Sequence, residues 1–514
     1  MRLPFSSHDP QDTGPQYLED LATGYWFSEV LFTAVELGVF NLLEPMGKTA
    51  DHVAEMLNSD PRGVRRFLHA LWALGLLGRE GAVYFNTRIS KEYLVIGREN
   101  YQGNAILWRK HLSPYWRGLK KCLRAGGRVV YRSDEDRELN YRVRRYVRAM
   151  DSVARIKVGE ILPIFEGVFP EGEILDVGAG SGAITAGFLG RFPTMRATLM
   201  DLPEVLNYAG ELMRKRRLEK RVTYCRANIL ESWPLDKNSF DLVILSNIIH
   251  AYSETDVSGV LDSAAECLKE KGFLIIHDFF LEHVSEKASL FDLNMFINTY
   301  NGMVFSEGWV REKLGRLKLY AAGLIPLKTD TALIIASKDE KSLSKLRLSP
   351  ESRLAAVIRG LGFRTVCPIP VGTVHVPGWA GLCCRFGCEL YGKPHCPPDS
   401  PSPERTREIL GDYSRAFLLE GEPPTGDFQR RVLRAEREAF REGFYKAFAF
   451  WAGPCALCDS CGTDGVCRNT LDSRPSMEGA GIDVFETVRR AGLSLRPLKD
   501  RDDYVKYFAL LLLE

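Results

Sequence analysis

The sequence predicts an α/β protein in three parts: a helical N-terminal domain, a central sheet with helices on its faces, and a C-terminal α+β domain rich in cysteine. Its 514 residues suit about three domains of roughly 150 residues each. Between residues 171 and 337, short apolar runs typical of strands alternate with helical stretches. Eight of the 12 cysteines fall within residues 383–467, so the last part of the chain carries a chemistry of its own.

Residues 1–100 are expected to form helices followed by a small hairpin. Apolar residues recur at helical spacing from Val53 to Leu74, Thr49 suits an N-cap, and Asp60-Pro61 begins a second helix. The segment 76–86 is typical of a hairpin. Two helices followed by a hairpin indicate a winged helix. Because the chain lacks a wide basic field, we expect this domain to serve dimerisation or to cover a substrate, and not to bind DNA.

Residues 101–337 are expected to form the central domain, of which 101–170 are connecting helices. Arg144 and Arg148 in this helical stretch are interpreted as part of a solvated basic face. Six strands are predicted, and their sequences are EILDVGA, ATLMDLP, VTYCRANI, DLVILSN, GFLIIHDF and TALIIAS. Alternation of this kind predicts a mostly parallel sheet. The polar segment 338–352 is interpreted as a linker, and residues 353–514 as the cysteine-rich domain, which ends in the strand-like YFALLLL.

The polar and glycine residues that follow the predicted strands suggest a nucleotide-type ligand. A glycine loop lets the backbone turn sharply and approach a ligand closely, although such a turn also has purely structural uses. Asp201, 25 residues after Asp176, could accept two hydrogen bonds from a ribose diol. Asn228 could contact an adenine amino group. The predicted cofactor-binding residues are Asp176, Gly178, Gly180, Gly182, Asp201, Asn228 and Asn247.

With these motifs, residues 15–337 resemble the class I S-adenosylmethionine-dependent methyltransferases. They are most similar to the O-methyltransferase family with an N-terminal dimerisation winged helix, which includes hydroxyindole, caffeate and bacterial polyketide enzymes. The segments that carry the resemblance are ILDVGAGSG, MDLPEV, NIIHAYSETD and GFLIIHDFFLE. The resemblance implies a Rossmann-like domain that binds S-adenosylmethionine, with the glycines beside its methionine moiety, Asp201 at the ribose and Asn228 near the adenine. The family more often has Asp at the position of Asn228.

His250 is the candidate catalytic base, since a hydroxyl acceptor must lose a proton during methyl transfer and histidine titrates near neutrality. The resemblance places His250 at the family's catalytic histidine and Asp278 at the acidic residue that orients it. The alternative is that His250 caps a strand end or fills the acceptor pocket. His277 is interpreted as a structural neighbour, and no catalytic role is assigned to Glu307.

The spacing Cys455-x2-Cys458-x2-Cys461-x5-Cys467 favours a [4Fe–4S] cluster over zinc, because three evenly spaced thiolates match a ferredoxin run better than paired zinc ligands. Residues 353–514 resemble a family of predicted metal-binding proteins through CRFGCELYGKPHCPP, CALCDSCGTDGVCR and RPSMEGAGIDVFET. This resemblance adds the ligands Cys384, Cys388 and Cys396. A second cluster held by these three would have an open iron, unless Cys383 closes it; both possibilities stay open.

We therefore expect a cytoplasmic, homodimeric methyltransferase that acts on a small-molecule acceptor, with O-methylation favoured. An open iron of the C-terminal domain could bind that acceptor. In two alternatives, the domain transfers electrons to a redox partner, or the whole chain is a non-catalytic, zinc-stabilised scaffold. A net charge of +2 argues against nucleic-acid binding, and no apolar run reaches the ~20 residues that a membrane span needs. The first residues lack the apolar core of a signal peptide.

Overall fold

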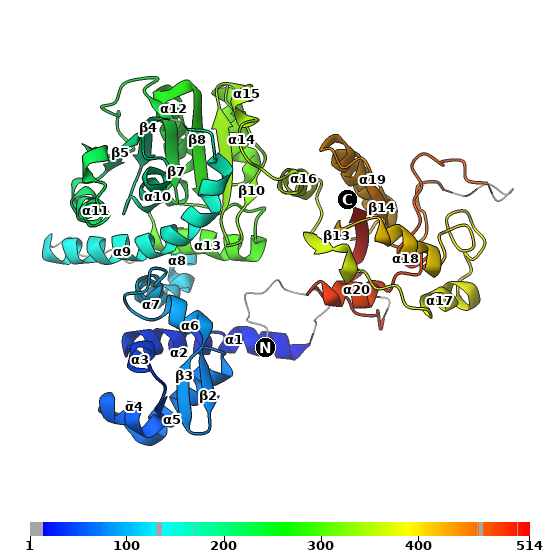
Figure 1. Ribbon diagram of the computed structural model, residues 1–514, viewed down its shortest axis with the longest axis horizontal. Helices are drawn as coiled ribbons and strands as arrows, with labels where there is room; N and C mark the ends of the chain where they lie inside the picture. Colours follow the sequence, from blue (N-terminus) through cyan, green and yellow to red (C-terminus); the bar gives the residue numbers. More distant parts are fainter. Residues whose placement is uncertain (1–13, 130–135, 170, 460, 462–465, 501) are drawn as a thin grey trace. The chain divides into compact units, whose positions relative to one another are not determined.

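The computed structural model describes residues 14–129, 136–169, 171–459, 461, 466–500 and 502–514. The chain forms two compact units, which divide between Arg347 and Leu348 (Figure 1). The division lies inside the predicted linker 338–352, which contains a short helix and the beginning of another. In the part of the chain that the structure describes, no helix combines the length and the apolar character needed to cross a membrane.

The N-terminal part of the first unit has the two helices and the hairpin expected from the sequence. Its helices are α1 (Pro15–Thr23), α2 (Tyr25–Glu36), α3 (Val39–Leu42), α4 (Ala50–Met56), α5 (Pro61–Ala73) and α6 (Arg88–Tyr93), and its strands are β1 (Lys48–Thr49), β2 (Leu77–Glu80) and β3 (Val83–Asn86). Asp60 caps α5 by accepting a hydrogen bond from the Gly63 amide at 2.8 Å, and Thr49 caps α4. Strand β3 pairs with both β1 and β2 in an antiparallel sheet.

Three helices connect this part to the central sheet: α7 (Gly103–Trp116), α8 (Leu119–Ala125) and the long α9 (Asp136–Ile161), followed by η1 (Leu162–Phe165). Arg144 and Arg148 on the basic face of α9 are exposed, as expected, but both also have partners on a neighbouring helix. Arg148 donates a hydrogen bond to the Tyr208 hydroxyl at 2.6 Å, and Arg144 pairs with Glu211 at 3.2 Å. Both partners lie on α11 (Pro203–Lys215), so these arginines join the connecting helices to the central domain.

The central sheet is mostly parallel, as predicted. Its strands are β4 (Gly172–Val177), β5 (Met195–Asp201), β6 (Val222–Arg226), β7 (Phe240–Ser246), β8 (Leu268–Asp278), β9 (Tyr320–Ala321), β10 (Ile325–Pro326) and β11 (Ala332–Ser337). They lie in the order β10-β11-β8-β7-β4-β5-β6, and β9 also pairs with β11. Strands β4 to β8 are parallel, and β11 runs antiparallel to β8. The chain reverses its strand order between β4 and β7, which is where open sheets of this kind bind ligands.

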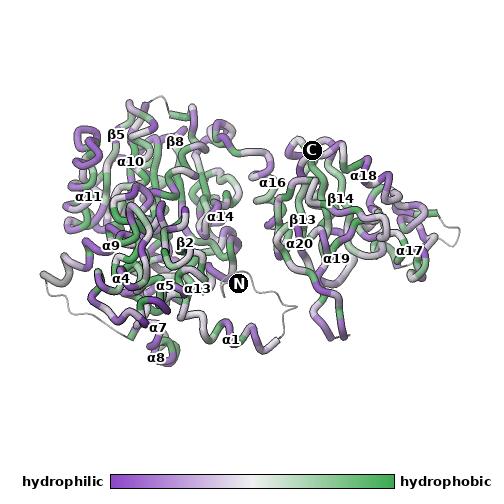
Figure 2. The backbone as a smooth tube through the Cα atoms, turned by 60° about the horizontal axis from the view of Figure 1, so that its bottom comes forward, coloured by the Kyte–Doolittle hydropathy of each residue, from purple (hydrophilic) through white to green (hydrophobic). Residues whose placement is uncertain are grey.

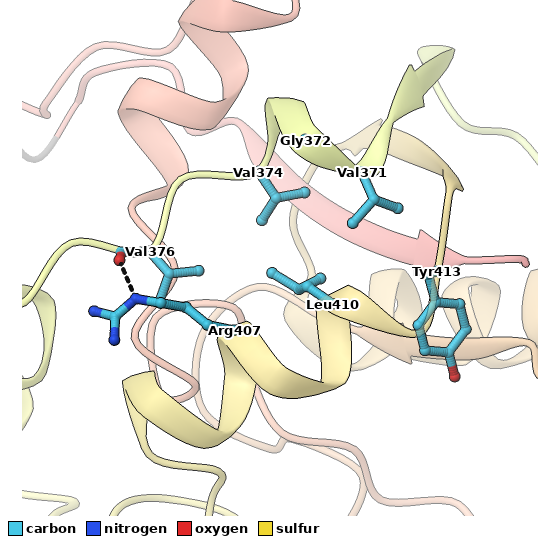
Figure 3. Close-up of a pocket in the computed structure, with 7 residues that line it drawn as sticks. All are labelled: Val371, Gly372, Val374, Val376, Arg407, Leu410 and Tyr413. Atoms are coloured by element: carbon cyan, nitrogen blue, oxygen red, sulfur yellow. Dashed lines mark hydrogen bonds between the residues drawn. The ribbon is translucent and has the colours of Figure 1, made fainter.

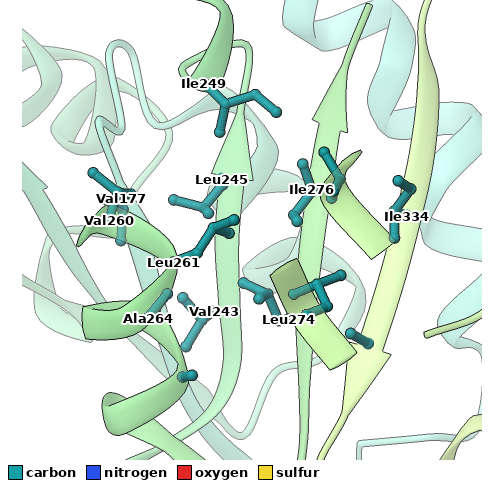
Figure 4. Packing of buried hydrophobic residues seen from close by; sticks show 14 of the residues in the cluster. Val177, Val243, Leu245, Ile249, Val260, Leu261, Ala264, Leu274, Ile276 and Ile334 are labelled. Atoms are coloured by element: carbon teal, nitrogen blue, oxygen red, sulfur yellow. The ribbon is translucent and has the colours of Figure 1, made fainter. Parts of the chain in front are cut away.

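The remaining helices of the first unit cover this sheet. They are α10 (Ala183–Arg191), η2 (Glu219–Arg221), η3 (Ile249–Ala251), α12 (Glu254–Cys267), α13 (Ser285–Asn298), α14 (Glu307–Arg316) and α15 (Glu340–Leu343). Val243, Leu245 and Leu274 pack against Leu261 and its neighbours on α12, and all are fully buried (Figure 4). Ser253 and Asp256 form a capping box that begins α12 directly after η3. This cap fixes the point at which the chain leaves the sheet beside His250.

The second unit has α+β architecture around one antiparallel sheet. Its elements are α16 (Pro350–Arg359), β12 (Thr365–Pro370), η4 (Val371–Thr373), α17 (Ala380–Gly387), α18 (Pro403–Gly411), β13 (Arg415–Gly421), α19 (Thr425–Arg441), β14 (Phe448–Phe450), α20 (Val484–Arg490) and β15 (Tyr507–Leu512). The strand order is β12-β13-β15-β14. One apolar core contains residues of α16 and α19, and a second contains residues of α18 and α20. The predicted strand YFALLLL is β15. Apolar residues, green in Figure 2, lie along the strands of the central sheet and of this sheet.

Candidate functional site

The glycine loop after β4 is shaped for a ligand. Gly178, Gly180 and Gly182 have φ of +63°, +56° and +67°, a region that favours glycine. A Cβ on Gly178 would come within 2.7 Å of Ile248, whereas a Cβ on Gly180 would meet no atom within 4 Å. The loop is therefore packed against Ile248 at Gly178 and faces open space at Gly180. Such an open side is needed where a glycine loop lies beside a bound cofactor.

Asp201, at the end of β5, is held by the same loop. Its carboxylate accepts hydrogen bonds from the Gly180 amide at 2.8 Å and from the Leu202 amide at 2.7 Å. Burial raises the pKa of this carboxyl, and the two amide hydrogen bonds act in the opposite direction. Each carboxylate oxygen keeps a further lone pair, so both can still accept a hydroxyl of a ribose.

The other predicted cofactor residues have more local roles in this structure. Asp176 is buried beneath the loop and accepts a hydrogen bond from the Thr185 hydroxyl at 2.6 Å, while burial raises the pKa of its carboxyl to about 7. Asn228 makes two hydrogen bonds within its own turn. Its Nδ2 donates to the Glu231 carboxylate, and its Oδ1 accepts from the Leu230 amide. Asn247 directly follows β7 with φ of +52°, and its backbone amide donates to the His277 carbonyl at 2.7 Å.

His250 and Asp278 lie together at the carboxyl ends of β7 and β8. The His250 Nδ1 and the Asp278 Oδ1 are 2.6 Å apart, and the Phe279 amide also donates to this oxygen at 2.8 Å. Asp278 is buried, whereas 12% of the His250 side chain stays accessible to solvent. Among the described residues, nothing hydrogen-bonds to the His250 Nε2. The carboxylate thus favours the tautomer that carries its proton on Nδ1, with Nε2 available as a base.

His277 is fully buried next to this pair. Its Nδ1 lies 2.8 Å from the Ser246 hydroxyl and its Nε2 lies 2.9 Å from the Thr331 hydroxyl. Burial lowers the pKa of His277 to about 4, with the charge of Lys157 adding to the effect. Both nitrogens are occupied by hydroxyl groups in the sheet, so His277 has the environment of a structural residue. The Glu307 carboxylate is likewise occupied, because it accepts from the Leu324 amide and Arg311.

Aromatic rings that the sequence reasoning did not single out surround His250. Phe279 and Phe291 stack with ring centroids 3.9 Å apart, and the Phe291 ring meets His250 edge-on at 4.9 Å. Tyr146, on α9, contacts Trp108 of α7 with ring centroids 5.3 Å apart. Burial and the charges of Asp201 and Asp278 raise the pKa of Tyr146 to about 12. Helical periodicity cannot distinguish such residues from ordinary packing residues, and no sequence motif marks them.

Eight of the nine cysteines of the second unit are free thiols in two segments that approach each other. Cys383 and Cys384 lie on α17, Cys388 and Cys396 follow it, and the later four lie beyond β14 (Figure 1). Burial raises the pKa of Cys396, and the neighbouring thiols of Cys388, Cys384, Cys461 and Cys455 add to this shift. Among the described residues, no three His, Cys, Asp or Glu side chains are grouped tightly enough to hold a metal ion.

Two of the later thiols already have backbone hydrogen bonds. The Asn469 amide donates to the Cys467 Sγ at 3.3 Å, and the Leu457 amide donates to the Cys455 sulfur. Amide donors to sulfur stabilise thiolates, which are the form of cysteine that binds metal. The donor set therefore fits a soft metal or an iron–sulfur cluster chemically, although the ligands are not gathered at one point.

The segment after these cysteines is anchored by a buried ion pair. Arg474 makes two hydrogen bonds to Glu436 on α19, of which the Nε to Oε2 distance is 2.9 Å, and its guanidinium lies 5.4 Å from the Phe448 ring centroid. Glu436 also accepts a hydrogen bond from the Ala449 amide at 2.7 Å. Arg474 thus connects the cysteine-bearing segment to the core of the unit.

A surface cavity of about 310 Å³ lies elsewhere in the second unit (Figure 3). Its lining residues are Val371, Gly372, Val374, Val376, Arg407, Leu410 and Tyr413. The two polar side chains are occupied: Arg407 donates from Nε to the Val376 carbonyl at 3.0 Å, and Tyr413 donates to the Lys446 carbonyl at 2.8 Å. The cavity therefore presents no group with an evident chemical task.

Comparison with known families agrees with this geometry. Residues 19–95 match the O-methyltransferase dimerisation domain, residues 118–321 match the O-methyltransferase domain, and residues 367–513 match a family described as predicted metal-binding proteins. The chain is 27% identical to a 3-hydroxy-5-methyl-1-naphthoate 3-O-methyltransferase of Streptomyces sahachiroi over 317 residues, which are 60% of this chain and 91% of the relative.

Two further comparisons extend this result. Over 273 residues the chain is 30% identical to an N,N-dimethyltransferase of Streptomyces rimosus, with 51% of this chain and 77% of the relative covered. The crystal structure of human N-acetylserotonin methyltransferase in complex with S-adenosylmethionine is similar with a TM-score of 0.56 and 25% identity, and the match covers 65% of this chain and 99% of that one. The glycine loop, Asp201 and the His250–Asp278 pair lie within the matched methyltransferase domain. The chain therefore belongs to the S-adenosylmethionine-dependent O-methyltransferase family, with the family's dimerisation domain before the catalytic domain and a predicted metal-binding domain after it.

Proposed function

We propose that the protein methylates a hydroxyl group of a small aromatic acceptor, with His250 as the general base. The observation that carries this proposal is the 2.6 Å contact between the His250 Nδ1 and Asp278 at the edge of the sheet where ligands bind. S-adenosylmethionine supplies the methyl group: its S–CH3 bond breaks as the O–CH3 bond forms, and S-adenosylhomocysteine leaves. The hydroxyl proton moves to the His250 Nε2.

Asp278 is a positioning residue in this proposal. Its carboxylate accepts the Nδ1–H hydrogen bond, keeps Nε2 unprotonated before the reaction, and stabilises the imidazolium that forms when the proton arrives. The Phe279 amide holds the carboxylate in place. The stacked rings of Phe279 and Phe291 offer an apolar surface for a planar acceptor, and the name of the naphthoate-methylating relative is consistent with an aromatic hydroxyl compound.

The cofactor would lie along the glycine loop. Gly180 faces open space beside which its methionine moiety would lie, Gly178 and Gly182 allow the sharp turn of the loop, and Asp201 would accept hydrogen bonds from its ribose. Asp176 supports the loop from below. Asn228 would lie near the adenine, and Asn247 would lie at the same edge of the sheet, directly after β7. The open space above Gly180 and the unused lone pairs of Asp201 support this arrangement.

Replacement of His250 tests the proposal. His250→Ala should lower kcat by about 10²- to 10⁴-fold, because general base catalysis contributes that much, and should change the Kd for S-adenosylhomocysteine less than about twofold. His52→Ala, at an exposed position on α4, is the matched control and should behave as the wild type. Unchanged turnover in His250→Ala would rule out the base. An acceptor nitrogen would need no strong base, so methylation of amines that is insensitive to His250 would point to N-methylation instead.

We also propose a homodimer formed through the N-terminal helices. Leu18, Leu21, Tyr25 and Trp26 on α1 and α2 are between 46% and 66% exposed, which is unusual for large apolar side chains and typical of an interface. Light scattering of the purified protein should give twice the chain mass of 57.9 kDa. Leu18→Glu combined with Trp26→Glu should shift it to a monomer, and a wild-type monomer would contradict the proposal.

For the second unit we propose that Cys455, Cys458, Cys461 and Cys467 hold a [4Fe–4S] cluster, and that Cys384, Cys388 and Cys396 hold a second. The amide hydrogen bonds to Cys455 and Cys467 support thiolate ligands at both ends of the later motif. The open iron of a three-cysteine cluster would bind a hydroxyl, carboxylate or thiol of the acceptor, unless Cys383 completes the set. Iron and sulfide analysis after anaerobic purification should give about four or eight of each per chain. Zinc without sulfide would replace this proposal with a structural zinc site.

Serine variants separate the roles of the two cysteine segments. If an open iron binds the acceptor, Cys384→Ser, Cys388→Ser and Cys396→Ser should raise KM by about tenfold or more. If the unit transfers electrons instead, these variants should leave methylation unchanged and remove a reversible reduction signal that acceptors do not perturb. In both cases Cys367→Ser is the control, because this thiol lies outside both motifs on β12.

A further inference from the structure

Residues 299–305, the post-α13 segment, follow α13 directly and lie against the backbone of the candidate base. A Cβ on Gly302 would come within 2.5 Å of the His250 carbonyl oxygen and within 2.9 Å of the Ala251 carbonyl carbon, where ordinary contacts begin at 3.4 Å. Gly302 is buried, and its φ lies outside the positive region that favours glycine. Glycine is therefore needed at this position for space and not for the turn of the backbone.

Hydrogen bonds hold Gly302 in this place. Its amide donates to the Thr299 hydroxyl at 2.9 Å, and this hydroxyl donates to the Met295 carbonyl on α13 at 2.7 Å. The Asn301 Nδ2 donates to the Asp256 Oδ2 at 2.9 Å, and Asp256 belongs to the capping box that begins α12. The post-α13 segment is thus tied to the helix before it and to the helix that begins after His250.

The other end of the post-α13 segment reaches the strand that carries Asp278. Phe305 forms a parallel bridge with Phe280, two residues after Asp278, and its carbonyl accepts a hydrogen bond from the Leu281 amide at 3.3 Å. Both phenylalanines are buried. One short segment therefore lies against the backbone at His250 and pairs with the backbone just beyond Asp278.

The same segment supports the aromatic rings beside the base. Val304 is buried in a small cluster that contains Phe279 and Phe291, and its amide donates to the Asp292 carboxylate at 2.7 Å. The centroid of the Phe291 ring lies 4.9 Å from that of His250. A displacement of the post-α13 segment would therefore reach both the backbone of the base and a ring in contact with its imidazole.

We propose that Gly302 is a positioning residue for the catalytic base, because it lets the post-α13 segment set where His250 stands against Asp278. The proposal rests on the proposed function, since it concerns the same His250 Nε2 and the same acceptor hydroxyl. A base must lie within about 2.6–3.2 Å of the group that it deprotonates, and a misplacement of about 1 Å can cost about 10²-fold in rate. The overlap that a Cβ on Gly302 would create is of that size, because 2.5 Å falls almost an ångström short of an ordinary contact of 3.4 Å. A methyl group at this position is thus enough to move the base.

Gly302→Ala tests the proposal, with Gly259→Ala on α12 as the matched control, because a Cβ on Gly259 would meet no atom within 4 Å. With 2-naphthol as the acceptor probe, Gly302→Ala should lower kcat by about 10²-fold. The KM for 2-naphthol and the Kd for S-adenosylhomocysteine should each change less than about threefold, since neither ligand loses a contact. Gly259→Ala should behave as the wild type.

A second readout does not depend on turnover. In the full-length protein with isotope-labelled histidine and bound S-adenosylhomocysteine, nitrogen NMR distinguishes the two neutral tautomers of each imidazole, and the His250 signals are assigned by their loss in His250→Ala. Wild type should carry the His250 proton on Nδ1, where Asp278 accepts it. Gly302→Ala should give a mixture of both tautomers, because the contact with Asp278 lengthens, and Gly259→Ala should not.

Thr299 offers a milder change in the same segment. Thr299→Val keeps the shape of the side chain but removes the hydroxyl that accepts from the Gly302 amide, so kcat should fall by about tenfold. Thr299→Ser keeps a hydroxyl and should restore most of this loss. If Gly302→Ala no longer binds S-adenosylhomocysteine and is therefore misfolded, the Thr299 pair decides.

Three results would overturn the proposal: wild-type kcat in Gly302→Ala, a lower kcat with unchanged His250 signals in that variant, or equal kcat in Thr299→Val and Thr299→Ser. Failure of the proposed function has a different pattern. In that case wild type does not bind S-adenosylhomocysteine, or His250→Ala methylates 2-naphthol at the wild-type rate and Gly302→Ala moves the His250 signals without lowering kcat.

Discussion

The methyltransferase site and the cysteine region represent two ways of building a functional site. At the carboxyl ends of β7 and β8, backbone amides and side chains hold each reacting group: Asp278 is fixed by the Phe279 amide, and His250 is fixed by Asp278. In the second unit, the thiols lie on α17 and on loops beyond β14, and half of the eight are exposed. The described cysteines are close to one another but not grouped as ligands.

This difference follows from what stabilises each site. A sheet with a buried core positions its strand ends whether or not a ligand is bound, so the geometry of the His250–Asp278 pair is part of the fold. Loop cysteines have no such core, and their final positions depend on the metal that binds them. We therefore expect the first site to be preorganised and the second to be completed by its metal.

Removal of the metal should produce the largest effect and tests this contrast directly. Structural metal sites contribute on the order of 10 kcal/mol to the folding of small domains. After chelation under anaerobic conditions, hydrogen exchange at the Leu457 and Asn469 amides should speed up by more than about 10²-fold, because these amides donate to the sulfurs of Cys455 and Cys467, two of the proposed ligands. Amides of β4 and β7 should not change. Equal exchange in both segments with and without metal would show that the cysteine region is preorganised too.

Asp278→Asn should have the next largest effect, on kcat. An amide donates to Nδ1 where the carboxylate accepts, so it would favour the tautomer with a protonated Nε2, which cannot act as a base. We expect kcat to fall about 10²-fold or more while KM and the cofactor Kd change little. Asp262→Asn, which disrupts an exposed pair with Lys313, is the control. A loss confined to KM would mean that Asp278 only shapes the acceptor pocket.

The Glu436→Gln variant tests whether the pair with Arg474 holds the segment after the cysteines in place without metal. Glu436 is buried and paired with Arg474, and breaking such a pair costs about 3 kcal/mol or more. Faster exchange of the Trp451 and Met477 amides, which bond to the segment around Arg474, would report this loss in the metal-free protein. Glu438→Gln on the same helix disrupts only an exposed pair with Arg441 and should change little. If both variants behave alike, Arg474 is not the anchor.

The sequence was most informative for functional residues that directly follow a predicted strand. The strands, the glycine loop and Asp201 follow from motifs at strand ends, because a parallel sheet brings its carboxyl ends together. The pairing of Asp278 with His250 was implied by the resemblance to the methyltransferase family. The cysteine spacing identified the later four cysteines as candidate ligands, and the resemblance to the metal-binding family added Cys384, Cys388 and Cys396. Phe291 and Tyr146 were not found, since they lie on helices whose placement over the sheet depends on tertiary packing. The contacts of Arg148 with Tyr208 and of Arg144 with Glu211 were not predicted for the same reason, because these partners lie 60 and 67 residues further along the chain.

The smallest expected effect concerns the buried polar groups of the central sheet. The folded-state pKa of His277 is about 4, against an ordinary value of 6.5. Between these values the unfolded chain binds a proton that the folded chain does not, so the free energy of unfolding should fall as the pH is lowered from 6.5 toward 4, by at most about 3 kcal/mol. His277→Gln should remove this pH dependence, measured by urea unfolding of the first unit followed through β8 amide exchange.

Asp176 should make the free energy of unfolding depend on pH in the opposite direction from His277. Its folded-state pKa of about 7 lies above its ordinary value of 3.8, so the unfolded chain loses a proton that the folded chain keeps, and stability should fall as the pH rises from 4 to 7. In wild type the effects of His277 and Asp176 oppose each other, so the free energy of unfolding should change little with pH. His277→Gln should therefore leave a stability that falls with rising pH, and Asp176→Asn one that rises with it. Parallel shifts in both variants would mean that neither group keeps its folded-state pKa in the absence of cofactor.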